Sequence, residues 1–478
     1  MEILAKLFTR HFGSAPSRVE AVQGDLGGSG RAIVRLADAS HTAIGIQNDV
    51  LEENAAFLEF TRRFRAHGLP VPEIYCVDTP NGAYLEEDLG DVTLFHFLAQ
   101  NRRGVEIAPE AVSAYRRVVE VLPRFQIEAG SDFNYAACYP RASFDRQSIA
   151  WDLNYFKYYF LKLSGIPFHE QALEEDFERL TELLLSADRG YFLYRDFQSR
   201  NIMLRDGQPS FLDYQGGRRG SLQYDIASLL FDAKAELPPD IRAQLLEHYL
   251  EALANHVTVD RSAFLETYYA YVYVRIVQAL GAYGFRGFFE RKVHFLQSVP
   301  YALRNLRWLL HNVSLPIQLP ALMSAFATMV GSEKLQTIST PAAEKDGLTV
   351  SVTSFSFHRG PVQDESGNGG GFVFDARALP NPGREDRFKK LTGLDASVID
   401  YLEREPAVKE FLKNAMTMVD ASVGEYERRG FRNLMVSFGC TGGQHRSVYL
   451  AEQTAKHLSG RSGVRVVLQH REQETWQR

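Results

Sequence analysis

The sequence contains few cysteines, no long apolar run and no strong charge of either sign. Only three of its 478 residues are cysteine, which is too few for a disulfide framework and is typical of a reducing compartment. No run approaches the roughly 18 apolar residues of a membrane span, and the first residues lack the apolar core of a signal peptide. The net charge of −6 provides no general attraction to nucleic acid or anionic membranes. We therefore expect a cytoplasmic protein without membrane contact.

The length and composition indicate a globular protein with more than one domain. A chain of 478 residues suffices for two or three domains, and 45% hydrophobic with 23% charged residues are ordinary values. Residues 331–347, GSEKLQTISTPAAEKDG, show a loose, mostly polar pattern, which favours a linker. We place the domain boundary near residue 346.

The strongest chemical signal lies in residues 191–215, YFLYRDFQSRNIMLRDGQPSFLDYQ. The dipeptide Asp206-Gly207 between two short apolar segments predicts a β-hairpin. The hairpin places Asn201 and Asp213 next to each other at the end opposite its turn, and a polar loop places Asp196 at the same end. Two carboxylates and an amide oxygen form an all-oxygen site suited to Mg²⁺, and a further carboxylate can accept the proton of a substrate hydroxyl. This arrangement is suited to phosphoryl transfer.

The same residues carry a resemblance. Asp196-x4-Asn201 followed by Asp213 resembles the catalytic and metal-binding loops of the aminoglycoside phosphotransferase-like kinases. The strings RDFQSRNIM, LDYQ and YDIASLL are similar to the branch that phosphorylates amino sugars such as N-acetylmuramate, N-acetylglucosamine or glucosamine in cell wall recycling. The resemblance implies that Asp196 is the catalytic base, that Asn201 and Asp213 hold Mg²⁺, and that Asp225 braces the catalytic loop. Tyr194 stands where the family has a histidine that supports this loop.

The resemblance also implies a fold and a nucleotide site. We expect an α+β, protein-kinase-like bilobal domain with an N lobe over residues 1–90 and a helical C lobe over 91–325. ATP is the expected phosphoryl donor. The residues expected to bind the nucleotide lie in the glycine-rich turn 24–31, on the strand after it and in the hinge between the lobes: Gly27, Gly28, Ser29, Arg31, Arg35, Glu86 and Asp88. A glycine-rich turn is by itself more often a plain hairpin than a phosphate loop.

One expected residue is missing. Such kinases carry a lysine on the third strand that pairs with the nucleotide phosphates, but this chain has no lysine between Lys6 and Lys157. Arg31 or Arg35 is the expected replacement for its charge. The competing interpretation is a pseudokinase that binds nucleotide and transfers the phosphoryl group slowly. The presence of Asp196, Asn201 and Asp213 argues against it.

Aromatic clusters are the candidates for a sugar platform. Residues 151–160, WDLNYFKYYF, contain six aromatic side chains, and residues 268–273 form a second cluster. At helical spacing such clusters are more often core. Should the first cluster face the acceptor, Asp152 and Asn154 can bind sugar hydroxyls, and Arg200 of the catalytic loop is a third candidate contact.

A second domain is expected over residues 347–478, after a linker at 326–346. The segment 434–458 reads as strand, glycine-rich loop and helix, and such a loop binds anions through backbone amides and the positive helix end. The candidate anion-binding residues are Cys440, Thr441, Gly442, Gly443, His445 and Arg446, with Asp375 and Arg377 after the preceding strand. The spacing Cys440-x5-Arg446 also matches the loop of cysteine-dependent phosphatases, in which the thiolate is a nucleophile.

Longer strings favour another family for this domain. FDARALPNP, LTGLD and FGCTGGQHRSVYLAE resemble the C-terminal domain of the RNase adapter protein RapZ, over nearly all of residues 347–478. The resemblance implies a small α/β domain that binds a phosphorylated amino sugar and, in some members, RNA; self-association through it is a further expectation. The segment carries 18 Lys and Arg against 16 Asp and Glu, a weak basic excess for an RNA-binding surface.

Two functions from different classes remain open. The first is an ATP- and Mg²⁺-dependent sugar kinase whose C-terminal domain binds a phosphorylated sugar as sensor or by product capture. The second is a regulatory protein with a silent kinase fold that senses nucleotide and phosphorylated amino sugar, or RNA.

Overall fold

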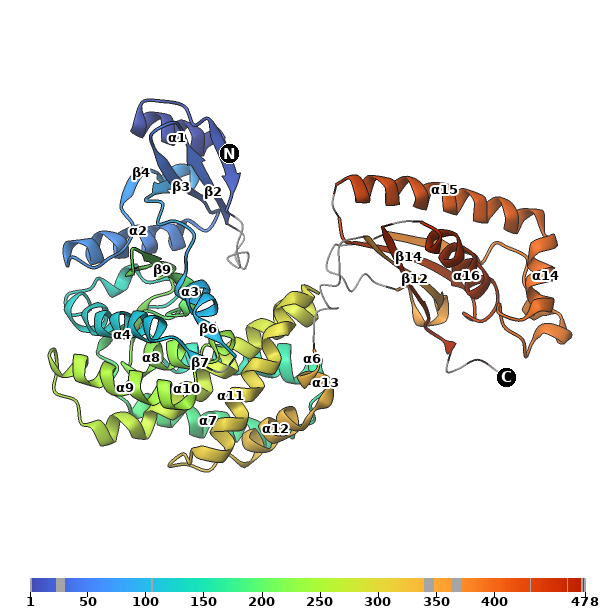
Figure 1. Ribbon diagram of the computed structural model, residues 1–478. Coiled ribbons are helices and arrows are strands. Elements are labelled where there is room, and N and C mark those ends of the chain that lie inside the picture. Colours follow the sequence, from blue (N-terminus) through green and yellow to red (C-terminus); the bar gives the residue numbers. More distant parts are fainter. Residues whose placement is uncertain are drawn as a thin grey trace. The chain divides into compact units, whose positions relative to one another are not determined.

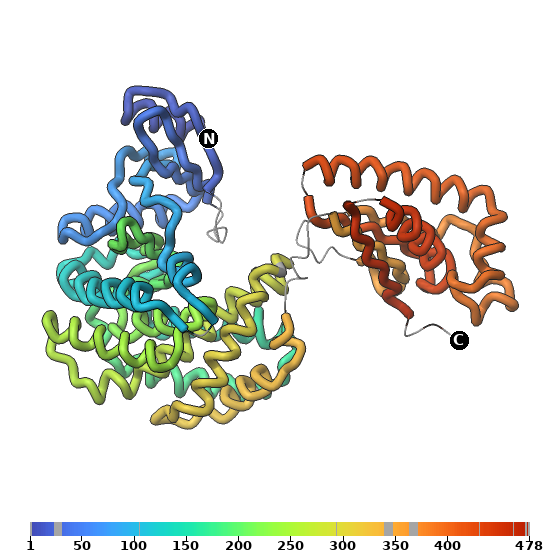
Figure 2. Tube along the Cα trace, in the orientation of Figure 1, coloured from blue at the N-terminus to red at the C-terminus, as the bar shows by residue number. Residues whose placement is uncertain are grey.

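The chain forms two compact units. The computed structural model describes residues 2–22, 31–104, 106–338, 348–362, 371–429, 431–461, 463–473 and 476. The first unit comprises residues 1–290 and 295–338, and the second is formed mainly by residues 339–478, as Figures 1 and 2 show. Within the described ranges, no helix combines the length and the apolar character needed to cross a membrane.

The first unit begins with a five-stranded antiparallel sheet in the order β1-β2-β3-β5-β4. The strands are β1 (Arg18–Ala21), β2 (Ala32–Ala37), β3 (Thr42–Gln47), β4 (Ile74–Asp78) and β5 (Ala83–Glu86). Successive side chains alternate between the two faces of such a sheet. Helix α1 (Glu2–Phe12) covers one face, where its Leu4 and Phe8 cluster with Leu36 and Leu85. The opposite face carries Ile46 and Tyr84, which belong to the large core shared with the helical lobe.

Helix α2 (Leu51–Ala66) joins the sheet to the rest of the unit. Its buried Phe57, Phe60 and Phe64 belong to the large core. The helix is followed by Gly68, whose φ of +65° is the left-handed conformation that glycine adopts without strain. Pro70 follows shortly after. A glycine and a proline shortly after the last helical residue are typical signals for the end of a helix.

The helical lobe follows β5. Its helices are α3 (Leu94–Gln100), α4 (Pro109–Pro123), α5 (Arg146–Phe156), α6 (Lys162–Ser164), α7 (Glu170–Ser186), α8 (Gln223–Leu230), α9 (Pro239–Ala254), α10 (Arg261–Gly284), α11 (Val299–Asn312), α12 (Pro320–Gly331) and α13 (Glu333–Gln336). Three short strand pairs lie among them: β6 (Arg102–Arg103) with β7 (Glu106–Ile107), β8 (Tyr191–Leu193) with β11 (Arg218–Gly220), and β9 (Ile202–Arg205) with β10 (Gln208–Phe211). An antiparallel sheet followed by a helical lobe confirms the expected bilobal α+β architecture.

Helix α10 runs through the lobe (Figure 1). Most of its side chains are buried, as expected of a helix that is apolar nearly all round. Asp260 caps its N-terminus by accepting hydrogen bonds from the backbone N–H groups of Ser262 and Ala263. Tyr268, Tyr271 and Tyr273 are each about 1% exposed or less. The aromatic cluster at 268–273 is therefore core.

Helices α12 and α13 occupy part of the segment where the sequence predicts a linker. Phe326, Met329 and Leu335 are fully buried in the core of the first unit. This unit accordingly extends to residue 338. The apolar face of PALMSAFATMVG packs against α11 and α7.

The second unit is a four-stranded parallel sheet in the order β13-β14-β12-β15. Its strands are β12 (Leu348–Ser356), β13 (Gly371–Asp375), β14 (Asn433–Cys440) and β15 (Val464–His470), and its helices are α14 (Ala396–Arg404), α15 (Pro406–Arg428) and α16 (Arg446–Ser459). A separate core of apolar side chains from these elements holds it together. This confirms the expected small α/β domain.

Candidate active site

The loop that carries Asp196 is held by a buried carboxylate on α8. Asp225 accepts hydrogen bonds from the backbone N–H groups of Tyr194 (2.9 Å) and Arg195 (3.0 Å), and Gln126 Nε2 donates to it at 3.3 Å. Complete burial raises the pKa of Asp225 to about 7, although these donors act in the opposite direction. Arg195 has a φ of +84°, a conformation that is uncommon outside glycine. The two N–H contacts hold this turn in place.

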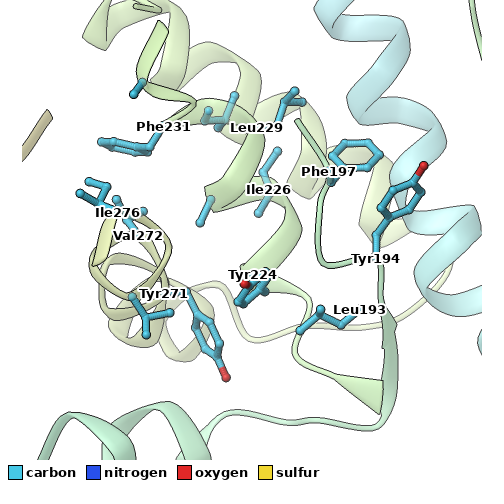
Figure 3. Close-up of a cluster of buried hydrophobic side chains, with 14 of the residues drawn as sticks. Leu193, Tyr194, Phe197, Tyr224, Ile226, Leu229, Phe231, Tyr271, Val272 and Ile276 are labelled. Carbon is cyan, nitrogen blue, oxygen red and sulfur yellow. The ribbon is translucent and has the colours of Figure 1, made fainter. Parts of the chain in front are cut away.

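Tyr194 supports the same loop from its other side. Its hydroxyl donates to the backbone carbonyl of Leu212 at 2.6 Å, one residue before Asp213. Its ring packs edge-on against Phe197 and Phe125, and Figure 3 shows the side chains of Tyr194 and Phe197 lying close together beside the loop. Burial raises the pKa of Tyr194 well above its usual value, so the hydroxyl stays a donor. A tyrosine can thus connect the two loops in place of the histidine.

The structure brings together the three residues predicted to act on the phosphoryl group. The hairpin β9–β10 turns at Asp206 and Gly207, both with positive φ, as the predicted type of turn requires. Asn201 Nδ2 donates to the backbone carbonyl of Asp196 at 2.9 Å and to Asp213 Oδ2 at 3.2 Å. Among the described residues no hydrogen bond to Asn201 Oδ1 is observed, so this oxygen is available to a cation.

The charges at this site favour a cation. Burial and the neighbouring Asp196 carboxylate raise the pKa of Asp213, against a hydrogen bond from Gln215 and the charge of Arg31. A divalent cation would relieve the repulsion between Asp196 and Asp213, and the oxygen donors fit Mg²⁺. No group of three or more His, Cys, Asp or Glu side chains with metal-binding geometry occurs in the described part of the chain. The candidate magnesium site thus consists of Asn201 and Asp213, with the Asp196 carboxylate beside them.

Arg31, directly before β2, takes the position between the sheet, α2 and Asp213. Its NH2 group donates to Glu53 Oε2 at 3.0 Å, and its NH1 group lies 3.7 Å from Asp213 Oδ1. Asn48 Nδ2 donates to the same Glu53 oxygen at 3.1 Å. The Arg31 side chain is only 14% exposed. It therefore places a fixed positive charge beside the candidate metal site.

Arg35 is bound elsewhere. Its guanidinium forms a two-pronged pair with Asp88, at 2.7 and 2.9 Å, and reaches Asp91 at 2.8 Å. Asp88 is thereby engaged with the sheet and with the backbone N–H of Gly90. Of the two arginines that the sequence offers in place of the lysine, the structure brings Arg31 to Asp213. Gly27, Gly28 and Ser29 lie outside the described residues, and Glu86 is buried at the end of β5.

The three residues predicted to contact a sugar, Asp152, Asn154 and Arg200, lie in different surroundings. Asp152 forms a two-pronged ion pair with Arg195, at 2.6 and 2.8 Å, and so braces the loop of Asp196 from α5. The Arg200 guanidinium lies 4.8 Å from the centre of the Phe95 ring. Asn154 is half-buried on α5. Of the aromatic segment 151–160, Phe156 and Phe160 are core, whereas Trp151 is 45% exposed.

Several supporting residues were missed by sequence reasoning. Tyr214 fixes α2 to the metal-binding loop: its ring stacks on Phe57 at 4.8 Å and its hydroxyl shares a 2.6 Å hydrogen bond with Thr61. Asp232 accepts from the Ser199 hydroxyl at 2.5 Å and anchors the end of the catalytic loop. Gln215 Nε2 donates to Asp213 Oδ1 at 2.7 Å. Tyr214 and Gln215 lay within the quoted string LDYQ without being assigned a role, and no local pattern signals Asp232.

The glycine-rich loop of the second unit is arranged around Arg446. Its NH1 group donates to the backbone carbonyls of Ala376 (3.3 Å), Arg377 (2.9 Å) and Leu379 (2.9 Å). The side chain is 4% exposed and its burial lowers the pKa. Arg446 NH2 also donates to Thr441 Oγ1 at 3.4 Å. This guanidinium therefore ties the segment after β13 to the loop.

The other predicted residues of this loop have mixed exposure. Cys440 is 3% exposed, and its sulfur accepts from the Gly443 N–H at 3.3 Å and lies 3.1 Å from the Ser447 hydroxyl. His445 Nε2 lies 2.9 Å from the Phe388 carbonyl, and burial lowers the His445 pKa. Gly442 is exposed. In a cysteine phosphatase the arginine of this loop binds the substrate anion. Here the Arg446 guanidinium donates to backbone carbonyl groups instead, so the loop lacks that geometry.

Asp375 and Arg377 form an ion pair with each other. Their closest contact is 2.7 Å, and the two side chains are 46% and 51% exposed. The Arg377 guanidinium also lies 4.0 Å from the centre of the Phe357 ring. Arg377 is thus the more accessible cation near the loop.

A comparison with curated proteins found relatives that match part of this chain. The chain is 40% identical over 139 residues to a "Nucleotide-binding protein" of Acidithiobacillus ferrooxidans, covering 29% of this chain and 44% of that one. It is 42% identical over 129 residues to a protein of the same description from Xylella fastidiosa, covering 27% of this chain and 43% of that one. The chain thus spans less than half the length of these relatives.

A comparison with solved structures found a choline kinase and a choline/ethanolamine kinase family protein. Choline kinase LicA from Streptococcus pneumoniae has a TM-score of 0.41 at 14% identity, over 64% of this chain and 98% of that one. A choline/ethanolamine kinase family protein from Mesorhizobium loti has a TM-score of 0.45 at 13% identity, over 69% of this chain and 99% of that one.

Two family models match the chain. Residues 348–474 match the family described as the RapZ C-terminal domain. Residues 13–261, more than half of the sequence, match the phosphotransferase enzyme family. The chain therefore belongs to this family, and it carries a RapZ C-terminal domain after the phosphotransferase domain in the sequence.

Proposed function

We propose that this chain is a kinase that transfers the γ-phosphoryl group of ATP to a hydroxyl of an amino sugar, such as N-acetylglucosamine, glucosamine or N-acetylmuramate. The observation that carries the proposal is the convergence of Asp196, Asn201 and Asp213, with Arg31 3.7 Å from Asp213. Two carboxylates, an amide oxygen and a fixed cation meet the requirements of phosphoryl transfer, which needs positioning and charge neutralisation.

Each residue has a role in the proposed reaction. Asp196 accepts the proton of the acceptor hydroxyl, whose oxygen forms the new bond to phosphorus while the bond to the leaving diphosphate oxygen breaks. Asn201 and Asp213 would hold Mg²⁺, which neutralises negative charge on the phosphates when bound. Arg31 adds a second positive charge, and its pair with Glu53 fixes the guanidinium in place.

The sugar class rests on two supports. The motif strings resemble the amino-sugar branch, and the same chain carries a RapZ C-terminal domain. We place a phosphorylated sugar on the 440–446 loop of that domain, with the exposed Arg377 as a cation for the phosphate. In this role the second domain senses or captures the kinase product. Three free cysteines fit a cytoplasmic setting.

A kinase assay with matched variants tests the proposal. The purified full chain is given ATP, Mg²⁺ and a panel of amino sugars and their neutral parent sugars, and products are identified by phosphorus NMR. We expect a sugar phosphate from the wild type and almost none from Asp196→Asn. Tight binding of phosphorylated sugar or RNA without any turnover would instead support a regulatory protein with a silent kinase fold.

A further inference from the structure

Two buried arginines beside the loop of Asp196 are not used by the reaction described above. Arg218 lies on β11 and is 6% exposed, and Arg275 lies on α10 and is 4% exposed. An arginine is seldom buried this far without a carboxylate partner. Arg195, the residue before Asp196, has such a partner in Asp152. A buried cation without an ion pair is costly, so the two other arginines point to a ligand.

Arg218 is held next to Asp196 by neutral acceptors. Its Nε atom donates to the backbone carbonyl of Gly216 at 3.0 Å, and its NH1 group contacts Ser148 Oγ at 3.5 Å. Gly216 lies against the proposed base, because a Cβ at this position would be 3.6 Å from Asp196 Oδ2. Among the described residues, no acceptor is observed for the NH2 group of Arg218. This group is therefore available to a ligand bound beside Asp196.

Arg275 approaches the same loop from α10. Its guanidinium carbon lies 5.1 Å from the centre of the Tyr224 ring, and that of Arg195 lies 5.3 Å from the centre of the same ring. The NH1 group of Arg275 donates to the Tyr224 hydroxyl at 3.0 Å and to Gln278 Oε1 at 2.6 Å. Its buried Nε atom has no acceptor in the described part of the chain. Arg275 is thus bound by neutral groups, like Arg218.

The carboxylates around the two arginines are engaged in other interactions. Asp152 pairs with Arg195, and Asp225 accepts hydrogen bonds from two backbone N–H groups. Asp196 acts on both guanidinium groups electrostatically, and it is the group that accepts a proton in the proposed reaction. Burial, together with the charge of Arg195, lowers the pKa of Arg218. An anion bound here would favour the charged form of Arg218 and offset the cost of its burial.

We propose that the acceptor sugar carries an anionic group, a carboxylate or a phosphate, which binds Arg218 and Arg275 beside Asp196. The inference rests on the proposed function, because it concerns the acceptor of that transfer. Guanidinium groups form charge-assisted and often bidentate hydrogen bonds with both kinds of anion. An anion held by these arginines positions the sugar next to the proposed base. A neutral sugar leaves the two cations unpaired, and it should be a poorer acceptor by about 10- to 100-fold.

Matched acceptors test the inference on the wild type alone. In the carboxylate arm, kcat/KM is measured for N-acetylmuramate, for its methyl ester and for N-acetylglucosamine, which lacks the lactyl group. In the phosphate arm, glucosamine 6-phosphate and glucosamine 1-phosphate are compared with glucosamine. We expect the charged acceptor to be preferred about 10- to 100-fold, and the arm that shows the preference identifies the anion. Equal use of charged and neutral acceptors in both arms would overturn the inference and leave the kinase assignment standing.

Variants separate recognition of the anion from a structural role. Arg218→Gln and Arg275→Gln should raise KM for the preferred anionic acceptor about 10- to 100-fold and leave kcat/KM for its neutral counterpart nearly unchanged. The control Arg219→Gln removes the neighbouring exposed arginine, whose guanidinium lies 4.3 Å from the centre of the Tyr135 ring. It should keep the preference for the anion. An equal loss of activity with charged and neutral acceptors in Arg218→Gln and Arg275→Gln would contradict the inference.

A chain without turnover is tested by calorimetry with the same acceptors on the wild type and Arg218→Gln. The comparison with Arg218→Gln distinguishes this site from any binding of sugar phosphate to the second unit. Tighter binding of the anionic acceptor that Arg218→Gln abolishes would support the inference even when the kinase assignment fails. Equal affinity for charged and neutral acceptors, or a difference that persists in Arg218→Gln, would overturn it.

Discussion

The hydroxyl of Tyr194 donates a 2.6 Å hydrogen bond to the backbone carbonyl of Leu212. This contact joins the loop of Asp196 to the strand end that leads into Asp213. The position is one where the related kinases carry a histidine. The tyrosine reaches the same neighbouring loop, and its burial among Phe125 and Phe197 fixes its direction.

Removing this hydroxyl should uncouple the two loops. In Tyr194→Phe the Leu212 carbonyl loses its donor in a buried setting, which costs about 1–3 kcal/mol. We expect a lower midpoint of urea unfolding. We also expect kcat to fall roughly 10-fold, because a small displacement of catalytic groups slows the chemical step. Tyr194→His should restore part of kcat. Unchanged stability and kcat in Tyr194→Phe would show that the contact does not position Asp213.

Arg31 and Arg35 should differ sharply when each is changed to glutamine. Arg31 lies 3.7 Å from Asp213 and is expected to act on the phosphates, so Arg31→Gln should lower kcat/KM for ATP by about 100-fold or more. Arg35 pairs with Asp88 and Asp91, so Arg35→Gln should chiefly lower thermal stability. Steady-state kinetics with a melting curve on both variants checks this. The opposite ranking would move the phosphate site to Arg35.

The carboxyl of Asp225 should make stability depend on pH. Its pKa is raised from an ordinary carboxyl value to about 7 in the folded chain. The contribution of the neutral form is complete below the unfolded-state pKa near 4 and is lost as pH rises toward about 7. The difference in unfolding free energy between the wild type and Asp225→Asn should therefore shrink over this range. A constant difference from pH 4 to 7 would contradict the raised pKa.

Arg446 and Cys440 give the second unit its own test. Arg446→Gln removes the donor of three backbone carbonyls and should lower the unfolding free energy of this unit by about 2–3 kcal/mol. The exposed Arg377→Gln is the matched control and should leave stability nearly unchanged while weakening sugar phosphate binding. Cys440→Ser should alter neither the kinase rate nor phosphate release. Loss of a phosphatase activity in Cys440→Ser would revive the nucleophile interpretation.

Local sequence patterns predicted the β9–β10 hairpin because the residues that determine it are close together in the sequence. Asp206-Gly207 fixes the turn, and the short distance to Asn201 and Asp213 fixes where these side chains meet. Asp196 joins them through a loop of only a few residues. The helix stop at Gly68 is likewise encoded by its immediate neighbours.

Contacts between distant segments could not be read in the same way. The pair of Arg195 with Asp152 joins residues 43 positions apart, and nothing near Asp152 distinguishes a loop brace from a sugar ligand. The residues next to Arg446 in the sequence predict a cation that binds anions. Its actual partners are backbone carbonyls of residues 67 to 70 positions away. Which arginine replaces the missing lysine depends on where α2 places Glu53, which is a tertiary property.

The central claim, that Asp196 is the base of a phosphoryl transfer to a sugar hydroxyl, is tested most directly by one comparison. Sugar phosphate formation and ATP affinity are measured for the wild type and Asp196→Asn under the same Mg²⁺ and sugar concentrations. We expect kcat to fall by about 10²–10⁴-fold with ATP affinity nearly unchanged, because the change removes a proton acceptor and leaves the phosphate site intact. Equal turnover by the two proteins, or no sugar phosphate from the wild type with any amino sugar, would contradict the claim.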